Sequence, residues 1–122
     1  MKYFSIEGDP LLFACPCDRH NCVATVNPKL PEVLDLIRDE TGIPMIITSG
    51  PRCVPHNIEI GGADYSEHID GEGADVLCSN SRDRFMLITA AMSHGINRIG
   101  VGKKFLHFGI SQTNDQFVMW TY

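Results

Sequence analysis

The sequence predicts a single α+β domain built around a mostly antiparallel β-sheet. Two segments place apolar residues at helical spacing, and several short apolar stretches between turn residues are typical of strands. The 122 residues are 43% hydrophobic and 20% charged, and no repeat or charged linker divides them, so one domain over residues 1–122 is expected. The order helix, strand, loop, strand, helix and several strands is typical of an α+β fold.

The first two elements follow each other between residues 27 and 50. The segment "NPKLPEVLDLIRDETG" predicts a helix that Gly42 ends, because its apolar residues share one face: Leu30, Val33, Leu34 and Ile37. The stretch "IPMIITSG", residues 43–50, predicts a buried strand. Residues 51–72 hold several glycines and prolines with little periodicity. They are expected to form a long irregular loop, which in a compact domain usually has a function.

The second half of the chain begins with "GADVLC", a second central strand in which Cys78 is expected to be a buried thiol. Residues 81–95 predict a helix with Ser81 as its N-cap, Gly95 as its stop and an apolar face formed by Phe85, Leu87, Ile88 and Met92. Three strand candidates follow at residues 96–102, 104–110 and 117–122. Trp120 and Tyr122 in the last of them are expected to pack in the core, and a place for Tyr122 in the wall of the cleft is the alternative.

The charge pattern argues against two classes of partner. The formal net charge is −5, and no run of lysine or arginine occurs, so neither nucleic acid nor an anionic membrane surface is expected. No window approaches the roughly 18 to 20 apolar residues that a membrane span needs. The amino-terminal "MKYFSIEGDPLLFACPC" lacks the apolar core of a signal peptide, so the protein is expected to be made in the cytoplasm.

One stretch carries the chemistry of a metal site. In "SEHIDGEGADV", residues 66–76, His68 and Asp75 flank a glycine-containing turn and can face one cleft. Catalytic zinc sites typically have three His, Cys or carboxylate ligands and one open position. His107 is the best third ligand, because on its strand it faces away from Leu106 and Phe108. A solvated turn and a structural histidine are the alternatives that these residues alone leave open.

Several separated motifs occur in a characteristic order: "SGPRCVPHNIEIGGADYSEHIDGEGAD", then "RIGVGKKFLHFG", then the closing "FVMWTY". They resemble the zinc D-alanyl-D-alanine carboxypeptidase family and its peptidoglycan peptidase relatives. The short phage and bacterial branch of that family has the pattern "SGYRCPxHNxxxGGxxxSxHxxGxAxD", followed by "FxHxD". The resemblance extends from about Phe13 to Tyr122 and implies the fold that this family shares with the amino-terminal hedgehog domain.

The resemblance implies that His68, Asp75 and His107 bind one catalytic Zn²⁺ and that Arg52 faces the cleft as a catalytic residue. The forked guanidinium of Arg52 suits a peptide carboxylate or a developing oxyanion, and a surface salt bridge is its alternative role. A metal-bound water, with its pKa near 7, is the expected nucleophile. The implied function is hydrolysis of peptidoglycan stem-peptide bonds that involve D-amino acids, by a carboxypeptidase or an endopeptidase. The implied setting is a phage or prophage protein that acts on the host cell wall.

The chain departs from this family at one position. The branch carries Asp two residues after the last histidine, where this chain has Gly109, and residues 101–106 hold no acid either. The candidate replacements for this acid, as the base that takes a proton from the water, are Glu67, Asp70, Glu72, His94 and Asp115. An inactive zinc-binding homologue that holds cell-wall peptide, or serves in a virion or assembly, is therefore the alternative function. A zinc-stabilised domain without a wall partner is a third hypothesis.

The five cysteines pose a second metal question, since an odd number cannot form a closed disulfide framework. Cys15, Cys17 and Cys22, with His20, have ligand chemistry, and Cys53 can join them if its loop folds back. Relatives with similar beginnings often carry the "RC" pair too, which suggests that the two segments meet. A structural zinc site at the four cysteines is one hypothesis, and a Cys17–Cys53 disulfide or ordinary thiols are the others.

Overall fold

The computed structural model describes residues 1–19 and 22–122. Its strands form one five-stranded sheet of order β1-β2-β4-β3-β5, in which every neighbouring pair is antiparallel except β3 and β5. The prediction of an α+β fold with a mostly antiparallel sheet is therefore confirmed. The elements are α1 (Pro10–Phe13), α2 (Lys29–Thr41), β1 (Ile47–Ser49), α3 (Val54–Glu59), β2 (Gly73–Leu77), α4 (Ser81–Ser93), β3 (Arg98–Val101), β4 (Phe105–Gly109) and β5 (Val118–Thr121).

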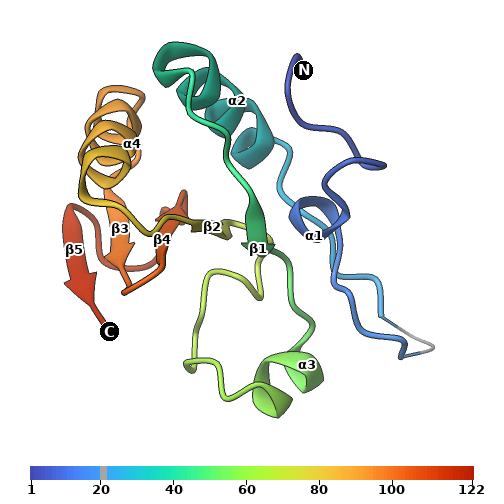
Figure 1. The fold of residues 1–122 in the computed structure, drawn as a ribbon. Helices are drawn as coiled ribbons and strands as arrows, with labels where there is room; N and C mark the ends of the chain where they lie inside the picture. The colour runs from blue at the N-terminus through green and yellow to red at the C-terminus, as the bar shows by residue number, and fades with distance from the viewer. Residues whose placement is uncertain (20–21) are drawn as a thin grey trace.

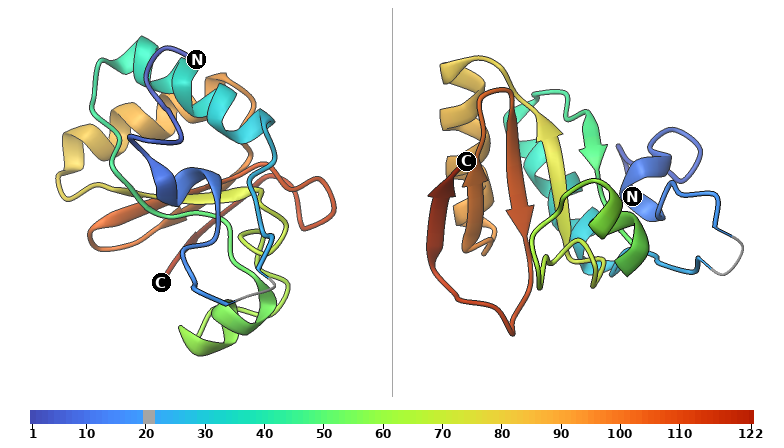
Figure 2. Two further views of the ribbon diagram at one scale, coloured as in Figure 1. Left: turned by 90° about the vertical axis from the view of Figure 1, so that its right-hand side faces the viewer. Right: turned by 90° about the horizontal axis from the view of Figure 1, so that it is seen from below.

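The two long helices cover one face of this sheet. In Figures 1 and 2, α2 and α4 lie side by side above the strands, whereas α3 and the chain around it lie on the opposite side. The core fills the space between the helices and the strands, and Phe108 is its largest fully buried side chain. Its main members are Leu30, Leu34 and Ile37 of α2, Leu87, Ala90 and Ala91 of α4, and Val76, Leu106 and Phe108 of the sheet. The face away from α2 and α4 is thus left for a site.

Helix α2 matches its prediction closely. Its buried side chains include Leu30, Leu34 and Ile37, and it ends at Gly42, whose φ of 68° is the left-handed conformation that glycine adopts without steric cost. The backbone N–H of Gly42 donates to the carbonyl of Arg38 and closes the last turn. The 3.6-residue periodicity determined this element, because one stripe of the helix faces the core.

Helix α4 differs from its prediction in two ways. Its N-cap is Asn80 rather than Ser81, and the Asn80 side chain accepts a 2.8 Å hydrogen bond from the backbone N–H of Asp83. The expected apolar face is also wrong in part, because Phe85 is 69% exposed and Met92 is exposed too. Small residues of α4 (Ala90 and Ala91) are buried instead. Their small size allows the helix to approach its neighbours closely. The helix is therefore rotated so that these alanines, rather than Phe85 and Met92, face the core.

The segment expected to be a long irregular loop contains helix α3. Its first turn includes Pro55, whose fixed φ suits the start of a helix. Six residues are too few to show a helical periodicity in the sequence, which is why this helix was not predicted. The strand expected over residues 43–50 covers only Ile47–Ser49. Among the described residues, no helix combines the length and the apolar character required to cross a membrane.

Candidate metal centre

The strand register brings two of the predicted ligands together. In the antiparallel β2–β4 pair, Asp75 lies directly opposite His107. The same row continues to Ser49 on β1, to Gly100 on β3 and from there to Trp120 on β5. Side chains alternate along a strand, and the neighbours of this row point into the core, so the row faces the side without α2 and α4. A line of polar and aromatic residues therefore crosses the open face of the sheet.

His68 reaches this row from the loop before β2. Its Nε2 lies 3.3 Å from Oδ1 of Asp75, and the same oxygen lies 2.9 Å from Nδ1 of His107. The two imidazole rings have centroids 4.9 Å apart and meet edge to face. Both histidines are buried. One ligand atom from each of the three residues lies within 4.8 Å of the others, which is the spacing of a metal-binding group.

Hydrogen bonds on the outer side of each histidine decide which nitrogen faces the centre. Nδ1 of His68 donates to the carbonyl oxygen of Gly50 at 2.8 Å, so Nε2 keeps its lone pair. Nε2 of His107 donates to Oε1 of Glu67 at 2.5 Å, so Nδ1, which lies 2.9 Å from Oδ1 of Asp75, is the nitrogen that faces the centre and can offer a lone pair to a metal once it is deprotonated. Two neutral imidazoles and one carboxylate that converge in this way form a donor set that fits zinc, and the outer acceptors are the usual partners of zinc-binding histidines.

The charges around the centre favour a cation. Burial raises the pKa of the Asp75 carboxyl, but hydrogen bonds to His107 and His68 outweigh it, and the net pKa is well below the ordinary range. Burial lowers the pKa of His107, but the hydrogen bonds to Asp75 and Glu67 outweigh it, and the net pKa is raised. Both shifts indicate that positive charge beside the two carboxylates is stabilised.

The carboxylate of Glu67 lies next to Gly109, the position at which the resemblance predicts an aspartate. Its Oε1 accepts from His107, and its Oε2 accepts from Nε of Arg98 at 3.0 Å and from the backbone N–H of Ser111 at 3.2 Å. A Cβ added to Gly109 would lie 1.9 Å from Oε1 of Glu67, so residue 109 must lack a side chain for this carboxylate to fit. Glu67 was one of five candidate replacements for the missing acid, and the structure places its carboxylate against a predicted ligand.

The partners of Glu67 also indicate its role. The side chain is 2% exposed, and both carboxylate oxygens have hydrogen-bond donors. Burial raises the pKa of Glu67, but the hydrogen bonds to His107 and Arg98 outweigh it and keep the net pKa low. An ionised, fully engaged carboxylate is suited to holding an imidazole in position. Arg98 and Ser111, which complete this arrangement, were not singled out from the sequence.

Arg52 borders the metal centre, as its motif implied. Its Nη2 lies 3.8 Å from Oδ2 of Asp75, and the side chain is mostly buried. Nε and Nη2 donate to Oγ of Ser49 at 3.3 Å and 3.1 Å, and Nη1 donates to Oδ1 of Asn57 at 3.0 Å. Burial lowers the pKa of Arg52 somewhat, but a guanidinium keeps its charge in proteins. A positioned cation therefore stands beside the predicted ligands.

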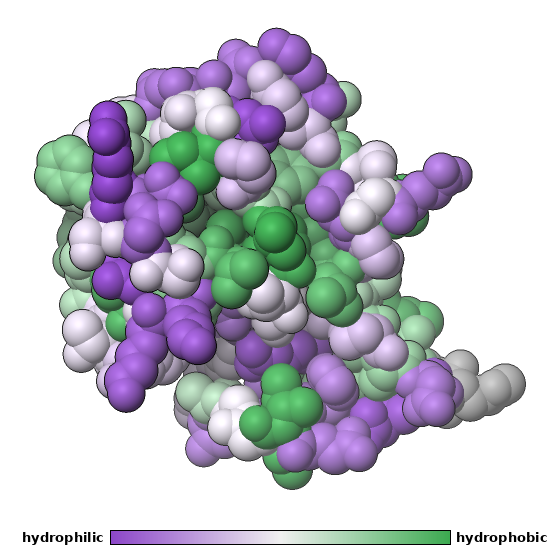
Figure 3. All heavy atoms as spheres, viewed as in Figure 1, coloured by the Kyte–Doolittle hydropathy of each residue, from purple (hydrophilic) through white to green (hydrophobic). Residues whose placement is uncertain are grey.

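These residues line a cleft of about 1040 Å³. In Figure 3, the α3 segment stands away from the rest of the protein at the bottom of the view, and hydrophilic residues lie in the hollow above it. The wall of the cleft is formed by the loops at residues 60–66 and 113–115 and by strands β3 to β5.

Of the candidate acids, Glu67 and Asp115 line this cleft, and Asp64, which sequence reasoning missed, does so too. Glu72 and His94 line a second, smaller pocket.

The expectation that Trp120 and Tyr122 pack in the core is wrong. Both line the cleft, and Tyr122 is 71% exposed. Trp120 pairs with Gly100 in the cross-strand row, and a Cβ at Gly100 would lie 2.8 Å from Nε1 of Trp120. The ring of Trp120 therefore lies over the backbone of β3, with its centroid 5.4 Å from that of His107. The alternation of "VMWTY" shows only that Trp120 and Tyr122 share a side, and the pairing of β5 decides which side it is.

One comparison with known proteins identifies a family. A family model described as Peptidase M15 matches residues 2–109, which is most of the chain and includes His68, Asp75 and His107. No curated protein matches this sequence. The matched span also contains Glu67 and ends at Gly109, the position that departs from the expected motif.

Proposed function

Because the chain belongs to the peptidase M15 family of zinc-dependent metallopeptidases, we propose that it hydrolyses peptidoglycan stem-peptide bonds that involve D-amino acids. The proposed zinc ligands are His68, Asp75 and His107. One observation carries the proposal: the ligand atoms of these residues converge in the wall of a cleft, while an acceptor holds the second nitrogen of each histidine. This convergence supports a metal site over a buried hydrogen-bond network that binds no ion.

Zinc held by His68, Asp75 and His107 would supply a water activated near neutral pH and would polarise the carbonyl of the bond to be cleaved. The chain does the positioning. The Gly50 carbonyl and the Glu67 carboxylate hold protons on the outer nitrogens of His68 and His107, so that both rings offer neutral lone pairs inward. Asp75, ionised because its pKa is low, adds one negative charge to the ligand set.

Glu67 supports an active enzyme against the inactive alternative. The argument for inactivity is the missing acid at Gly109. A carboxylate from residue 67 fills the space next to Gly109 and contacts His107. We therefore assign Glu67 as a positioning residue for His107. Its loss is expected to weaken zinc binding by about 10- to 100-fold, as is usual for such outer partners.

The proposed role of Arg52 is to bind the substrate. Its guanidinium is mostly buried beside Asp75, is anchored by Ser49 and Asn57, and lines the cleft. A fixed cation next to the metal suits a terminal carboxylate of a peptide, or the negative charge that develops on the carbonyl oxygen. The rings of Trp120 and Tyr122 offer apolar surface on another part of the wall.

Proton transfer needs a group that the zinc ligands do not provide. Glu67 is committed to His107, Arg98 and Ser111. The cleft wall holds two other acids, Asp64 and Asp115, and both are exposed. We propose that one of these two carboxylates exchanges protons with the reacting groups. Separate replacement by Asn distinguishes them, because only the participating acid is expected to reduce kcat strongly.

The proposed partner is therefore the peptide part of a bacterial cell wall, and the proposed setting is a phage or prophage product that acts on a host. Family membership and the basic residue beside the metal centre support the peptide partner. Family likeness alone supports the setting.

The experiment combines metal analysis with a wall assay. The purified chain is analysed for zinc and then incubated with peptidoglycan of several wall chemotypes between about pH 6 and 9, around the pKa expected for a zinc-activated water. Release of D-alanine or of new amino groups by the native chain, and not by His107→Ala, is the expected result. His94→Ala is the matched histidine control, since His94 lies outside the cleft.

The alternative function gives a different outcome in the same experiment. A zinc-loaded chain that sediments with peptidoglycan but releases nothing from any wall type would support a binding module and overturn the peptidase. A chain that holds zinc and neither binds nor cleaves the wall would overturn both and leave the zinc-stabilised domain.

A further inference from the structure

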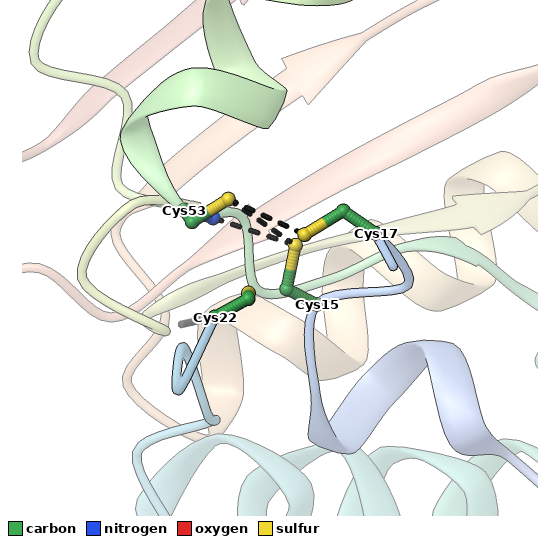
Figure 4. A group of neighbouring side chains, drawn as sticks. All are labelled: Cys15, Cys17, Cys22 and Cys53. Atoms are coloured by element: carbon green, nitrogen blue, oxygen red, sulfur yellow. Dashed lines mark hydrogen bonds between the residues drawn. The ribbon is translucent and has the colours of Figure 1, made fainter. Parts of the chain in front are cut away.

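Four of the five cysteines form a second cluster, which shares no residue with the metal centre. Cys15, Cys17 and Cys22 belong to the amino-terminal segment, and Cys53 precedes helix α3. Their sulfur atoms all lie within 4.8 Å of one another, and all four side chains are partly buried. Figure 4 shows the sulfurs of Cys15, Cys17 and Cys53 pointing toward one another from the two segments. His20, considered with this group from the sequence, lies outside the described residues.

The spacing of the sulfurs discriminates between a disulfide and a metal site. The Sγ atoms of Cys15 and Cys53 are 3.8 Å apart, and those of Cys17 and Cys53 are 3.5 Å apart. A disulfide requires about 2.05 Å. Four thiolates at about 2.3 Å from a central zinc ion lie about 3.8 Å from each other in a tetrahedron. These two distances match the edges of that tetrahedron. All four sulfurs form one compact group rather than two separate pairs.

Two further features suit a closed metal site. The backbone N–H of Cys53 points at Sγ of Cys15 at 3.5 Å, and such a donor stabilises a sulfur that carries negative charge. An isolated bridge between Ala14 and Thr25 also brings together the chain on either side of Cys15, Cys17 and Cys22. Four cysteines leave no open position for water or substrate, which is the mark of a structural site.

We propose that Cys15, Cys17, Cys22 and Cys53 bind one structural Zn²⁺, separate from the ion of the metal centre. Thiolate sulfur is a soft donor, and a tetrahedral group of four cysteines is an arrangement in which proteins hold structural zinc. This second site is independent of whether the chain hydrolyses peptidoglycan.

The segment at residues 50–53 connects this site to the metal centre. Cys53 directly follows Arg52, whose backbone N–H donates to the carbonyl of His68 at 2.9 Å. Gly50 accepts from the imidazole of His68, and a Cβ on Gly50 would lie 2.1 Å from the carbonyl oxygen of Leu11. An ion that ties Cys53 to the amino-terminal segment therefore also holds the segment that positions Arg52 and His68. The structural zinc thus supports the geometry of the reaction site.

Metal content tests the proposal directly. The full chain, purified under reducing conditions in zinc-containing medium, is expected to hold two zinc ions. The double variant Cys15→Ser/Cys17→Ser is expected to hold one, whereas Cys78→Ser keeps both, because Cys78 is buried elsewhere in the core. His68→Ala/His107→Ala is expected to lose the other ion. Each site is counted separately, so a failure of the cysteine site is distinguishable from a failure of the catalytic proposal.

A second measurement uses the unaltered chain, so it tests the proposal even if the cysteine variants do not fold. Cobalt replaces zinc in the unaltered chain, and a thiolate-to-cobalt charge-transfer band with tetrahedral d–d absorption is expected. The charge-transfer band is expected to disappear on titration with a mercurial reagent, which reacts with the thiolates. Absence of the charge-transfer band in the cobalt-loaded chain would overturn the proposal, as would unchanged zinc content in the cysteine double variant. A disulfide among the four cysteines, detected by mass spectrometry in protein purified without oxygen, would overturn it as well.

Discussion

The two clusters of metal-binding residues differ in what holds them in place. Asp75 and His107 are opposed in one ladder of an antiparallel sheet, and His68 is tied to the end of β1 through Gly50. The cysteine cluster lies outside the sheet, in an amino-terminal segment closed by one isolated bridge and in the turn before α3. Backbone hydrogen bonds set the first geometry. The second is proposed to depend on an ion that the four thiolates share.

This difference has an energetic consequence. A site assembled on a folded sheet is arranged largely before the metal arrives, so metal loss removes chemistry more than structure. A site assembled from loops draws its order from the binding energy of the ion, as in small zinc-stabilised domains. The two clusters should therefore respond differently to the loss of their ligands.

The largest effect is expected at the sheet-borne centre. Replacing His107 by Ala removes a ligand and is expected to lower kcat/KM on the order of a thousandfold or more, because several kcal/mol of metal assistance are lost. Circular dichroism is expected to show the fold retained. A His107→Ala chain that unfolds would contradict the view that the sheet orders this centre by itself.

The pair formed by Glu67 and Gly109 is expected to give the next largest effect. Glu67→Ala is expected to reduce zinc affinity by about 10- to 100-fold. Gly109→Asp alone is expected to damage the site, because the new Cβ would lie 1.9 Å from the Glu67 carboxylate. The double variant Glu67→Ala/Gly109→Asp is expected to recover most of the affinity, since it returns a carboxylate to the same space.

Zinc affinity and kcat/KM of the four chains in this cycle measure the coupling between the two positions. If the free-energy changes of the two single variants add up to that of the double variant, Glu67 and residue 109 do not share a role. Glu67→Gln retains the size of the side chain without its charge and is expected to fall between the native chain and Glu67→Ala.

Gly50→Ala tests the link between the two clusters. The new methyl group would meet the backbone carbonyl of Leu11 at 2.1 Å, so β1 and α1 must move apart. Crowding of this kind usually costs about 1–3 kcal/mol in the free energy of unfolding. Denaturant unfolding measures the cost, and both zinc affinities are expected to fall. Ser79→Ala, at an exposed position, is the control. A loss of stability with both zinc affinities unchanged would show that residues 50–53 do not couple the two clusters.

The smallest effect concerns local stability after metal removal. Without zinc, amide exchange in residues 14–25 is expected to rise by about tenfold, which corresponds to about 1.4 kcal/mol of local stability. Protection in β2 and β4 is expected to persist, because their amides are held in the sheet ladder. Hydrogen exchange measured by mass spectrometry reports both regions in one sample. Equal loss of protection in both would remove the contrast.

Some of this structure could be predicted because the information is local or periodic. Helix α2 follows from the spacing of its apolar residues, and strands β2 and β4 follow from short apolar runs. The face of His107 follows from strand alternation, because Leu106 and Phe108 on either side of it are buried in the core. The family motif placed Arg52 in the cleft in the same way, by its position in an ordered string.

Other features depended on packing that no local pattern encodes. Phe85 of α4 is exposed because alanines, rather than the largest apolar residue, face the core. Trp120 lies in the cleft because β5 pairs with β3 in parallel and places it over Gly100. Glu67 contacts His107, which is 40 residues away in the sequence, so its role was one of five equal options before the fold was known.

The sequence by itself determined the composition of the site: the residue types that bind zinc, their order along the chain and the turn that lets His68 and Asp75 face one side. Only the tertiary structure decided how the missing acid at Gly109 is replaced. The reason is steric. Gly109 on β4 has no side chain, so space remains beside it. The fold brings the carboxylate of Glu67, from another segment, into that space.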